Sequence, residues 1–234
     1  MQERIVHAAK RAGRDPSEVT LVAVSKTQSP ALIGAAYELG LRDFGENRVE
    51  EAEPKISGLP QEISWHMIGH IQRRKAKRVV PIFDMIHSVD SVRLAQRLDR
   101  LCADRPEPLP VLVECNVSGE ESKYGFRVDQ CNGNREARQV VLAAFADLIS
   151  LSHIQVQGLM TMAPIVSDPE EARPIFVRLR KLRDELAATF PQVDWRHLSM
   201  GMTDDFEVAI EEGATLVRVG RAIFAPDVPA WRKP

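Results

Sequence analysis

The sequence predicts a single closed (β/α)8 barrel preceded by one extra helix, and three observations support this fold class. The chain has 234 residues, near the usual size of one such barrel. Eight short runs rich in β-branched residues recur along it, and a segment of helical character follows each of the first seven. Alternating strands and helices imply parallel strands, and eight units in this length favour closure over an open doubly wound sheet. We therefore expect residues 1–234 to form one domain.

The expected strands are residues 19–26, 42–47, 64–70, 85–90, 110–117, 156–163, 195–201 and 215–224. Between them, Ser29 and then Pro30 have the pattern of an N-cap and first helical residue, and Ser91 is the expected start of another helix. After residue 168 we expect a helix whose first turns are broken by Pro174. Residues 203–213 complete the pattern with a short helix.

Composition and charge exclude several classes of protein. The chain is 44% hydrophobic and 27% charged, as in a soluble globular protein, and its net charge of −2 gives no general attraction to nucleic acid or to anionic membranes. Any anion site must therefore be local. Three cysteines at no metal-ligand or redox spacing favour the cytoplasm, and no apolar run is long enough for a membrane span. The basic, amphipathic first residues resemble an organelle presequence, but a packed first helix explains them more simply.

The first strand places a lysine where barrel enzymes gather their chemistry. The run VTLVAVSK is apolar until Lys26, at its C-terminal end. A desolvated lysine there would have a larger neutral fraction and could form an imine with an aldehyde. The simpler alternative is a lysine that extends into solvent.

The last strand carries an arginine within an apolar run. Arg218 is costly to bury without a partner, so it either pairs with a carboxylate such as Glu114 or donates a hydrogen bond to a ring atom of a ligand. Ser199 lies near the end of the seventh expected strand and Gly220 in the eighth. Barrels frequently bind phosphate at the ends of these two strands. A lysine for an imine, an arginine for a ring and a phosphate site together suggest pyridoxal 5′-phosphate (PLP).

Ordered motifs run through nearly the whole chain, from Leu21 to Phe224. They are LVAVSKTQ, DFGENRVEE, WHMIGHIQ, IHSVD, NVSGEESKYGF, GLMTMAP, LSMGMTDDFEVAIEEGAT and VRVGRAIF. In these motifs the chain closely resembles the PLP homeostasis protein family. The resemblance implies a fold-type III PLP-binding TIM barrel related to the alanine racemase N-terminal domain, with Lys26 as the Schiff-base lysine. It also implies Arg218 at the pyridine nitrogen, Asn47 and His70 along the cofactor, and around the phosphate Ser199, Met200, Gly220 and Arg221.

The function we expect is that of a cytoplasmic, monomeric PLP carrier in PLP homeostasis, without robust turnover and with PLP-requiring apoenzymes as partners. An arginine at the ring nitrogen weakens the electron sink that most PLP enzymes need. Alanine racemase adds a second domain that supplies a tyrosine base, and here only Tyr37 and Tyr124 could replace it. A low-activity amino-acid racemase is the enzyme alternative. A class I aldolase that uses Lys26 on a phosphorylated sugar is a third, but it leaves Arg218 without a role.

Three further features have simpler interpretations. The basic run RRKAKR lacks interleaved aromatic residues and is typical of a solvated helix face rather than a nucleic-acid site. His66 and His70 are four residues apart but have no third ligand, so we assign no metal. Lys123 is interpreted as a surface lysine. We expect no catalytic residue.

Overall fold

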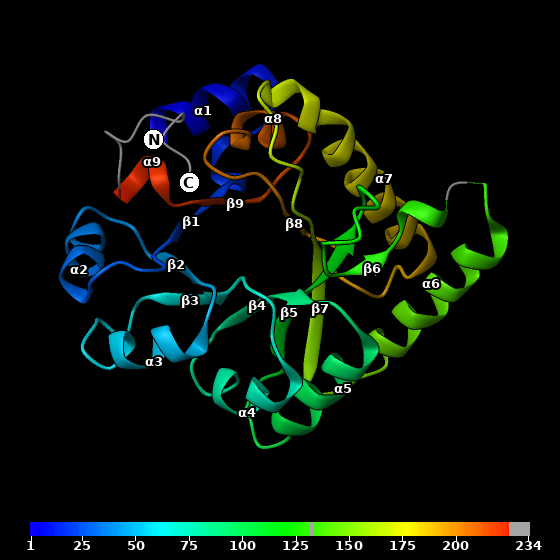
Figure 1. Ribbon diagram of the computed structural model, residues 1–234, viewed down its shortest axis with the longest axis horizontal. Helices are drawn as coiled ribbons and strands as arrows, with labels where there is room; N and C mark the ends of the chain where they lie inside the picture. The colour runs from blue at the N-terminus through cyan, green and yellow to red at the C-terminus, as the bar shows by residue number, and fades with distance from the viewer. Residues whose placement is uncertain (132, 225–234) are drawn as a thin grey trace.

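Eight parallel strands close into a barrel with helices outside it (Figure 1), in a computed structural model that describes residues 1–131 and 133–224. The order around the barrel is β4-β3-β2-β1-β9-β8-β7-β5, and pairing of β4 with β5 closes it. The predicted (β/α)8 fold class is confirmed. The strands are β1 (Thr20–Val24), β2 (Asp43–Glu46), β3 (Ser64–Met67), β4 (Met85–Val89), β5 (Leu109–Asn116), β7 (Ile154–Met160), β8 (His197–Ser199) and β9 (Leu216–Val219).

The helices form the outer layer. They are α1 (Gln2–Arg11), α2 (Pro30–Glu38), α3 (Val49–Ile56), α4 (Ala76–Val79), α5 (Val92–Leu101), α6 (Arg135–Ile149), α7 (Arg173–Thr189), α8 (Phe206–Glu211) and α9 (Arg221–Phe224). Short 3-10 turns precede or follow some of them, at η1 (Pro16–Glu18), η2 (Arg73–Lys75), η3 (Asp129–Cys131) and η4 (Pro169–Ala172). The two-residue strand β6 (Phe126–Arg127) pairs with the end of β5. Within the described ranges, no helix is both long and apolar enough to cross a bilayer.

Two predicted helix starts are confirmed by their caps. The Ser29 hydroxyl accepts a hydrogen bond from Leu32 N, with Pro30 at the first helical position, and the Ser91 hydroxyl accepts one from Leu94 N. The helix expected after residue 168 starts with the 3-10 turn η4, and α7 begins only at Arg173, so its first turns are interrupted as expected. Pro174 lies in the first turn of α7, where its missing N–H costs no helical hydrogen bond.

The final predicted strand is too long. Residues 215–224 divide into β9, which ends at Val219, and the short helix α9. Ile223 N and Phe224 N both donate to the carbonyl oxygen of Gly220, so the chain turns there. The apolar run VRVGRAIF carries no periodicity that would separate a strand from a following helical turn.

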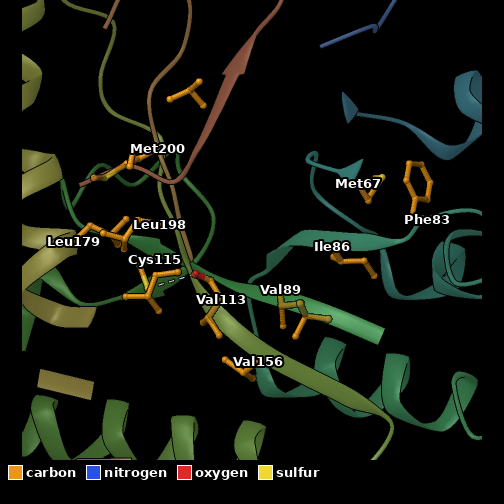
Figure 2. Packing of buried hydrophobic residues seen from close by; sticks show 14 of the residues in the cluster. Met67, Phe83, Ile86, Val89, Val113, Cys115, Val156, Leu179, Leu198 and Met200 are labelled. Carbon is orange, nitrogen blue, oxygen red and sulfur yellow. Dashed lines mark hydrogen bonds between the residues drawn. The ribbon is translucent and has the colours of Figure 1, made fainter. Parts of the chain in front are cut away.

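The core has two apolar layers. Val22, Leu112, Met160 and Leu216 form a cluster of their own, whose positions alternate with those of the main cluster, and they fill the barrel interior. The main cluster packs between the strands and the helices (Figure 2), with Ile86, Val113, Leu198 and Met200 among its labelled members.

The extra N-terminal helix packs on α8. Ile5, Ala8 and Ala9 of α1 are buried, and Arg4 donates to Glu207 across 2.6 Å. This contact brings the start of the chain beside the loops that follow β8 and β9, near the C-terminal end of the barrel (Figure 1).

Candidate functional site

A cavity of about 1020 Å³ opens at the C-terminal ends of the strands. Of the eight residues assigned to a ligand from the sequence, five line it, namely Lys26, Asn47, Arg218, Gly220 and Arg221. They come from the ends of β1, β2 and β9, which are neighbours in the sheet. The cavity therefore lies where barrel proteins carry their binding sites.

Lys26 follows β1 by two residues and is exposed. The sequence left open whether Lys26 is desolvated or extends into solvent, and in the structure its side chain borders an open cavity. The next residue, Thr27, has φ 65°, and it is the only residue other than glycine with positive φ in the described ranges. The turn that begins at Lys26 therefore has an unusual backbone conformation.

Arg218 lies inside the barrel and is 5% exposed. Its guanidinium donates to Ser199 Oγ across 2.5 Å and to the carbonyl oxygen of Thr161 across 2.9 Å. Burial lowers the pKa of Arg218 to about 10, and the nearby carboxyl groups of Asp205 and Glu114 partly offset this by raising it. Among the described residues no carboxylate forms an ion pair with it, so the structure does not support the proposed Glu114 pair. A buried charge that borders a cavity without an ion-pair partner is typical of a ligand site.

Glu114 is nearly completely buried within β5. Burial raises the pKa of its carboxyl group to about 7, and the negative charge of Asp90 raises it further, while Arg218 lowers it. This raised pKa belongs to a carboxyl group in the barrel interior, close to Arg218.

Ser199 and Met200 do not line the cavity. The Ser199 side chain is completely buried between Arg218 and His87, whose Nδ1 lies 2.8 Å from its oxygen. Met200, the next residue along, faces the opposite way and packs in the layer between strands and helices (Figure 2). Its amide also donates to Leu216 O. Neither side chain reaches the cavity.

His70 lies at the rim rather than in the large cavity. Its Nδ1 is 2.8 Å from Asp90 Oδ2, and its ring stacks on Tyr124 with centroids 3.8 Å apart. It lines an adjacent smaller pocket of about 270 Å³, which also includes Asn47. Asn47 is thus the residue that borders both spaces.

The region assigned to phosphate combines the loops after β8 and β9. Gly220 and Arg221 line the cavity, and Arg221 Nη2 donates to Asp204 Oδ2 across 2.5 Å. Asp205 is buried and accepts a hydrogen bond from Met202 N across 2.6 Å, which fixes the loop after β8. The two loops therefore face the same space, as the sequence led us to expect.

The sequence did not indicate several lining residues. Arg4 reaches the cavity from α1, and the loop after β7 contributes Met162, Pro164, Ile165, Val166 and Ser167. Lys123 was interpreted as a surface lysine, but its side chain is 16% exposed, pairs with Glu120 and donates to Met162 O. The contact between Lys123 and Met162 joins segments far apart in the chain, which no local sequence pattern predicts.

The comparisons with known proteins agree with this geometry. The family described as "Alanine racemase, N-terminal domain" matches residues 1–227. The pyridoxal phosphate homeostasis protein of Aquifex aeolicus is 40% identical over 223 residues, which are 95% of this chain and 93% of that protein. The chain belongs to the pyridoxal phosphate homeostasis protein family.

Solved structures of this family and beyond it share the fold. PipY of Synechococcus elongatus, 36% identical, has been solved without PLP and with PLP bound, at TM-scores of 0.82 and 0.79. Both structures cover 96% of this chain and 99% of PipY. Alanine racemase of Clostridium difficile, at 14% identity and a TM-score of 0.65, shows the barrel fold alone, and 58% of that chain is covered. The homeostasis proteins are named for PLP balance rather than for a reaction.

Proposed function

We propose that this protein binds PLP as a Schiff base on Lys26 and serves intracellular PLP homeostasis as a cofactor carrier without robust turnover. The observation that carries the proposal is that Lys26 and the buried Arg218 border one cavity, together with the loops after β8 and β9. The family and the PLP-bound structure of PipY support it.

The residues present fit the cofactor. The buried guanidinium of Arg218 donates to Ser199 and Thr161, which leaves further N–H groups for an acceptor such as a pyridine nitrogen. Gly220 and Arg221 line the same cavity and would hold the phosphate, and Arg4, which also lines it, would add positive charge. Ser199 contributes indirectly, because its hydroxyl group holds Arg218.

Covalent attachment requires one condensation. The bound cofactor supplies an aldehyde, and the neutral amine of Lys26 adds to its carbon, so that a C=N bond replaces the C=O bond and one water leaves. Arg218, a donor without an acceptor atom, holds the ring nitrogen as a hydrogen-bond acceptor. An unprotonated ring nitrogen is a poor electron sink, which favours storage over turnover.

The cavity lining also favours a carrier over a racemase. Proton removal and return on opposite faces of a substrate need two groups of suitable pKa. Of the chain's two tyrosines, Tyr124 stacks on His70 outside the cavity lining and Tyr37 lies on α2. A carrier that exchanges cofactor with apoenzymes needs an open site of this kind. We further propose that the protein is a monomer, and its three free cysteines favour the cytoplasm.

The test is an absorbance spectrum of the purified protein with PLP, before and after borohydride reduction, with mass mapping of the modified lysine. We expect one reduced adduct on Lys26 and none in Lys26→Ala. Lys77→Ala, which removes an exposed lysine of α4 outside the cavity, is the matched control and retains the adduct. An undiminished adduct in Lys26→Ala, for example on Lys123, would overturn the assignment.

A further inference from the structure

Four successive hydrogen bonds cross the barrel interior beneath the cavity. They join Arg218 to Ser199 across 2.5 Å, Ser199 to His87 across 2.8 Å, His87 to His66 across 2.9 Å, and His66 to Asp43 across 3.1 Å. These residues belong to β9, β8, β4, β3 and β2, so the chain of contacts links five of the eight strands. It runs from the cavity to the N-terminal end of β2, where the Asp43 side chain is 29% exposed.

The two ends of this relay fix the direction of every bond between them. A guanidinium can only donate, and a carboxylate can only accept. Ser199 Oγ is buried, and its recorded partners among the described residues are Arg218 and His87. Since the oxygen accepts from Arg218, the hydroxyl proton must point to His87 Nδ1, or it would be buried without an acceptor.

The same logic assigns both imidazole rings. With Nδ1 as an acceptor, a neutral His87 carries its proton on Nε2 and donates to His66 Nδ1. His66 is then protonated on Nε2 and donates to Asp43 Oδ1, with the Ser64 hydroxyl 3.2 Å from the same nitrogen. All groups are satisfied with both histidines neutral, and a single arrangement of protons achieves this.

Burial explains why His87 stays neutral. Its side chain is completely buried, and desolvation lowers its pKa well below the usual value. The positive charge of Arg218 lowers this pKa further. A protonated His87 would have to donate from Nδ1, and Ser199 Oγ would then face two donors.

We propose that His87, through Ser199, is a positioning residue for cofactor binding, and that the relay from Arg218 to Asp43 holds the guanidinium in the orientation that meets the ring nitrogen. This inference rests on the proposed PLP site and assigns that site a second layer of residues. Neither histidine lines the cavity, so both act through Arg218. Arg218 Nη1 donates to Ser199 and Nη2 donates to the carbonyl oxygen of Thr161. Together with the Thr161 contact, the relay therefore determines which guanidinium N–H groups remain for a ligand.

The first test uses the protein without PLP and does not depend on cofactor binding. Long-range 1H–15N spectra of histidine-labelled protein report which ring nitrogen of each histidine is protonated. We expect His87 and His66 as neutral rings protonated on Nε2, with the His87 signals assigned by their loss in His87→Asn. A His87 ring protonated on Nδ1 would overturn the relay.

The second test measures PLP affinity by titration. His87→Leu leaves the Ser199 hydroxyl without an acceptor and should weaken binding by about tenfold. In His87→Asn the amide oxygen can accept from Ser199, so affinity should stay within about threefold of the wild type. His197→Leu is the control, because His197 shares a β8 face with Ser199 but contacts Thr215 instead. Equal affinities in the wild type and in His87→Leu would refute the positioning role, whereas a wild type that binds no PLP would refute the proposed function and leave the protonation test standing.

Discussion

The Thr27 hydroxyl donates a hydrogen bond to the carbonyl oxygen of Lys26 across 2.6 Å, from a backbone with φ 65°. A β-branched residue in the left-handed region costs on the order of 1–3 kcal/mol, and it persists only where its surroundings enforce it. Gln28 N donates to Ser25 O, which closes a turn around Lys26. The strain therefore lies directly beside the proposed reactive lysine.

Thr27→Gly tests whether this strain positions Lys26. Glycine adopts positive φ without a penalty but adds freedom to the unfolded chain, so the free energy of unfolding should change by no more than about 1 kcal/mol. Glycine makes the turn that contains Lys26 more flexible. Lys26 must then lose this conformational freedom each time it reacts with PLP, so imine formation should slow by about fivefold. Stopped-flow absorbance and thermal unfolding measure the two effects. Thr27→Ala, which keeps the positive φ, is the control, and a wild-type rate in Thr27→Gly would contradict the positioning role.

A buried ion pair anchors the strand end before Lys26. Lys55 Nζ lies 2.9 Å from Glu46 Oε1 and also donates to Ser25 O, while the Ser25 hydroxyl donates to the same carboxylate. Glu46 is completely buried, and within the described part of the chain its Oε2 has no hydrogen-bond partner. The pair thus depends on a single carboxylate oxygen.

Lys55→Met should lower the free energy of unfolding by about 3–5 kcal/mol, because it leaves a buried carboxylate uncompensated. The double variant Glu46→Met/Lys55→Met removes both charges and should recover much of this loss. Urea unfolding of the wild type, both single variants and the double variant completes the cycle. If the double variant loses as much free energy of unfolding as the two single variants together, the pair is not coupled as its geometry indicates.

The fold and part of the site could be predicted because their signals are local. Ser29 and Pro30 mark a helix start within two residues, and Lys26 follows directly after an apolar strand. Arg218 was identified because a charge inside an apolar run is conspicuous. Each of these patterns lies within one element.

The rest depends on contacts that no single element reports. His87 lies in the motif IHSVD and shares a strand face with Met85, but only the closed barrel brings it to Ser199, 112 residues later. Arg4 reaches the cavity because α1 packs on α8. Ser199 was assigned to the phosphate from its strand-end position as well as by resemblance, and Met200 by resemblance alone. Strand alternation could have separated them, since neighbouring side chains face opposite ways.

Stability should depend on pH through Glu114. Its pKa is raised to about 7 in the folded protein, from 4.5 when unfolded, so the folded state binds more protons between these values. The Glu114 contribution to stability is therefore fully present at low pH and is lost as pH rises through 7. Between pH 5 and pH 8, the free energy of unfolding of Glu114→Gln should rise by roughly 2 kcal/mol relative to that of the wild type. His87 titrates in both proteins and cancels in the difference.

Urea unfolding of both proteins at several pH values measures this difference. Glu62→Gln, at an exposed position, controls for the substitution itself. The difference in free energy of unfolding between Glu114→Gln and the wild type should not stay constant or fall from pH 5 to pH 8. Either result would show that Glu114 is ionised in the folded protein throughout this range.

The carrier function predicts slow chemistry on free amino acids. Racemisation needs an acid and a base on opposite faces of the substrate. Lys26, once displaced by an amino acid, serves one face. Among the described residues that line the cavity, the other titratable groups are Arg4, Asp204, Asp205, Arg218 and Arg221. Asp204 pairs with Arg221, and Asp205 accepts a hydrogen bond from Met202 N, so both carboxylates already hold the proposed phosphate loops.

Incubation of the PLP-loaded protein with L-alanine in deuterated water tests this directly. We expect exchange of the Cα proton and formation of D-alanine to be absent or many orders of magnitude slower than turnover by a typical enzyme, about 10 per second. The open cavity admits water, which favours release of the cofactor over protection of a reactive intermediate. When a PLP-requiring apoenzyme is added to the same sample, the apoenzyme should regain activity. It should do so faster than when the Lys26→Ala variant is used in place of the wild type. Turnover near 10 per second would instead establish a racemase.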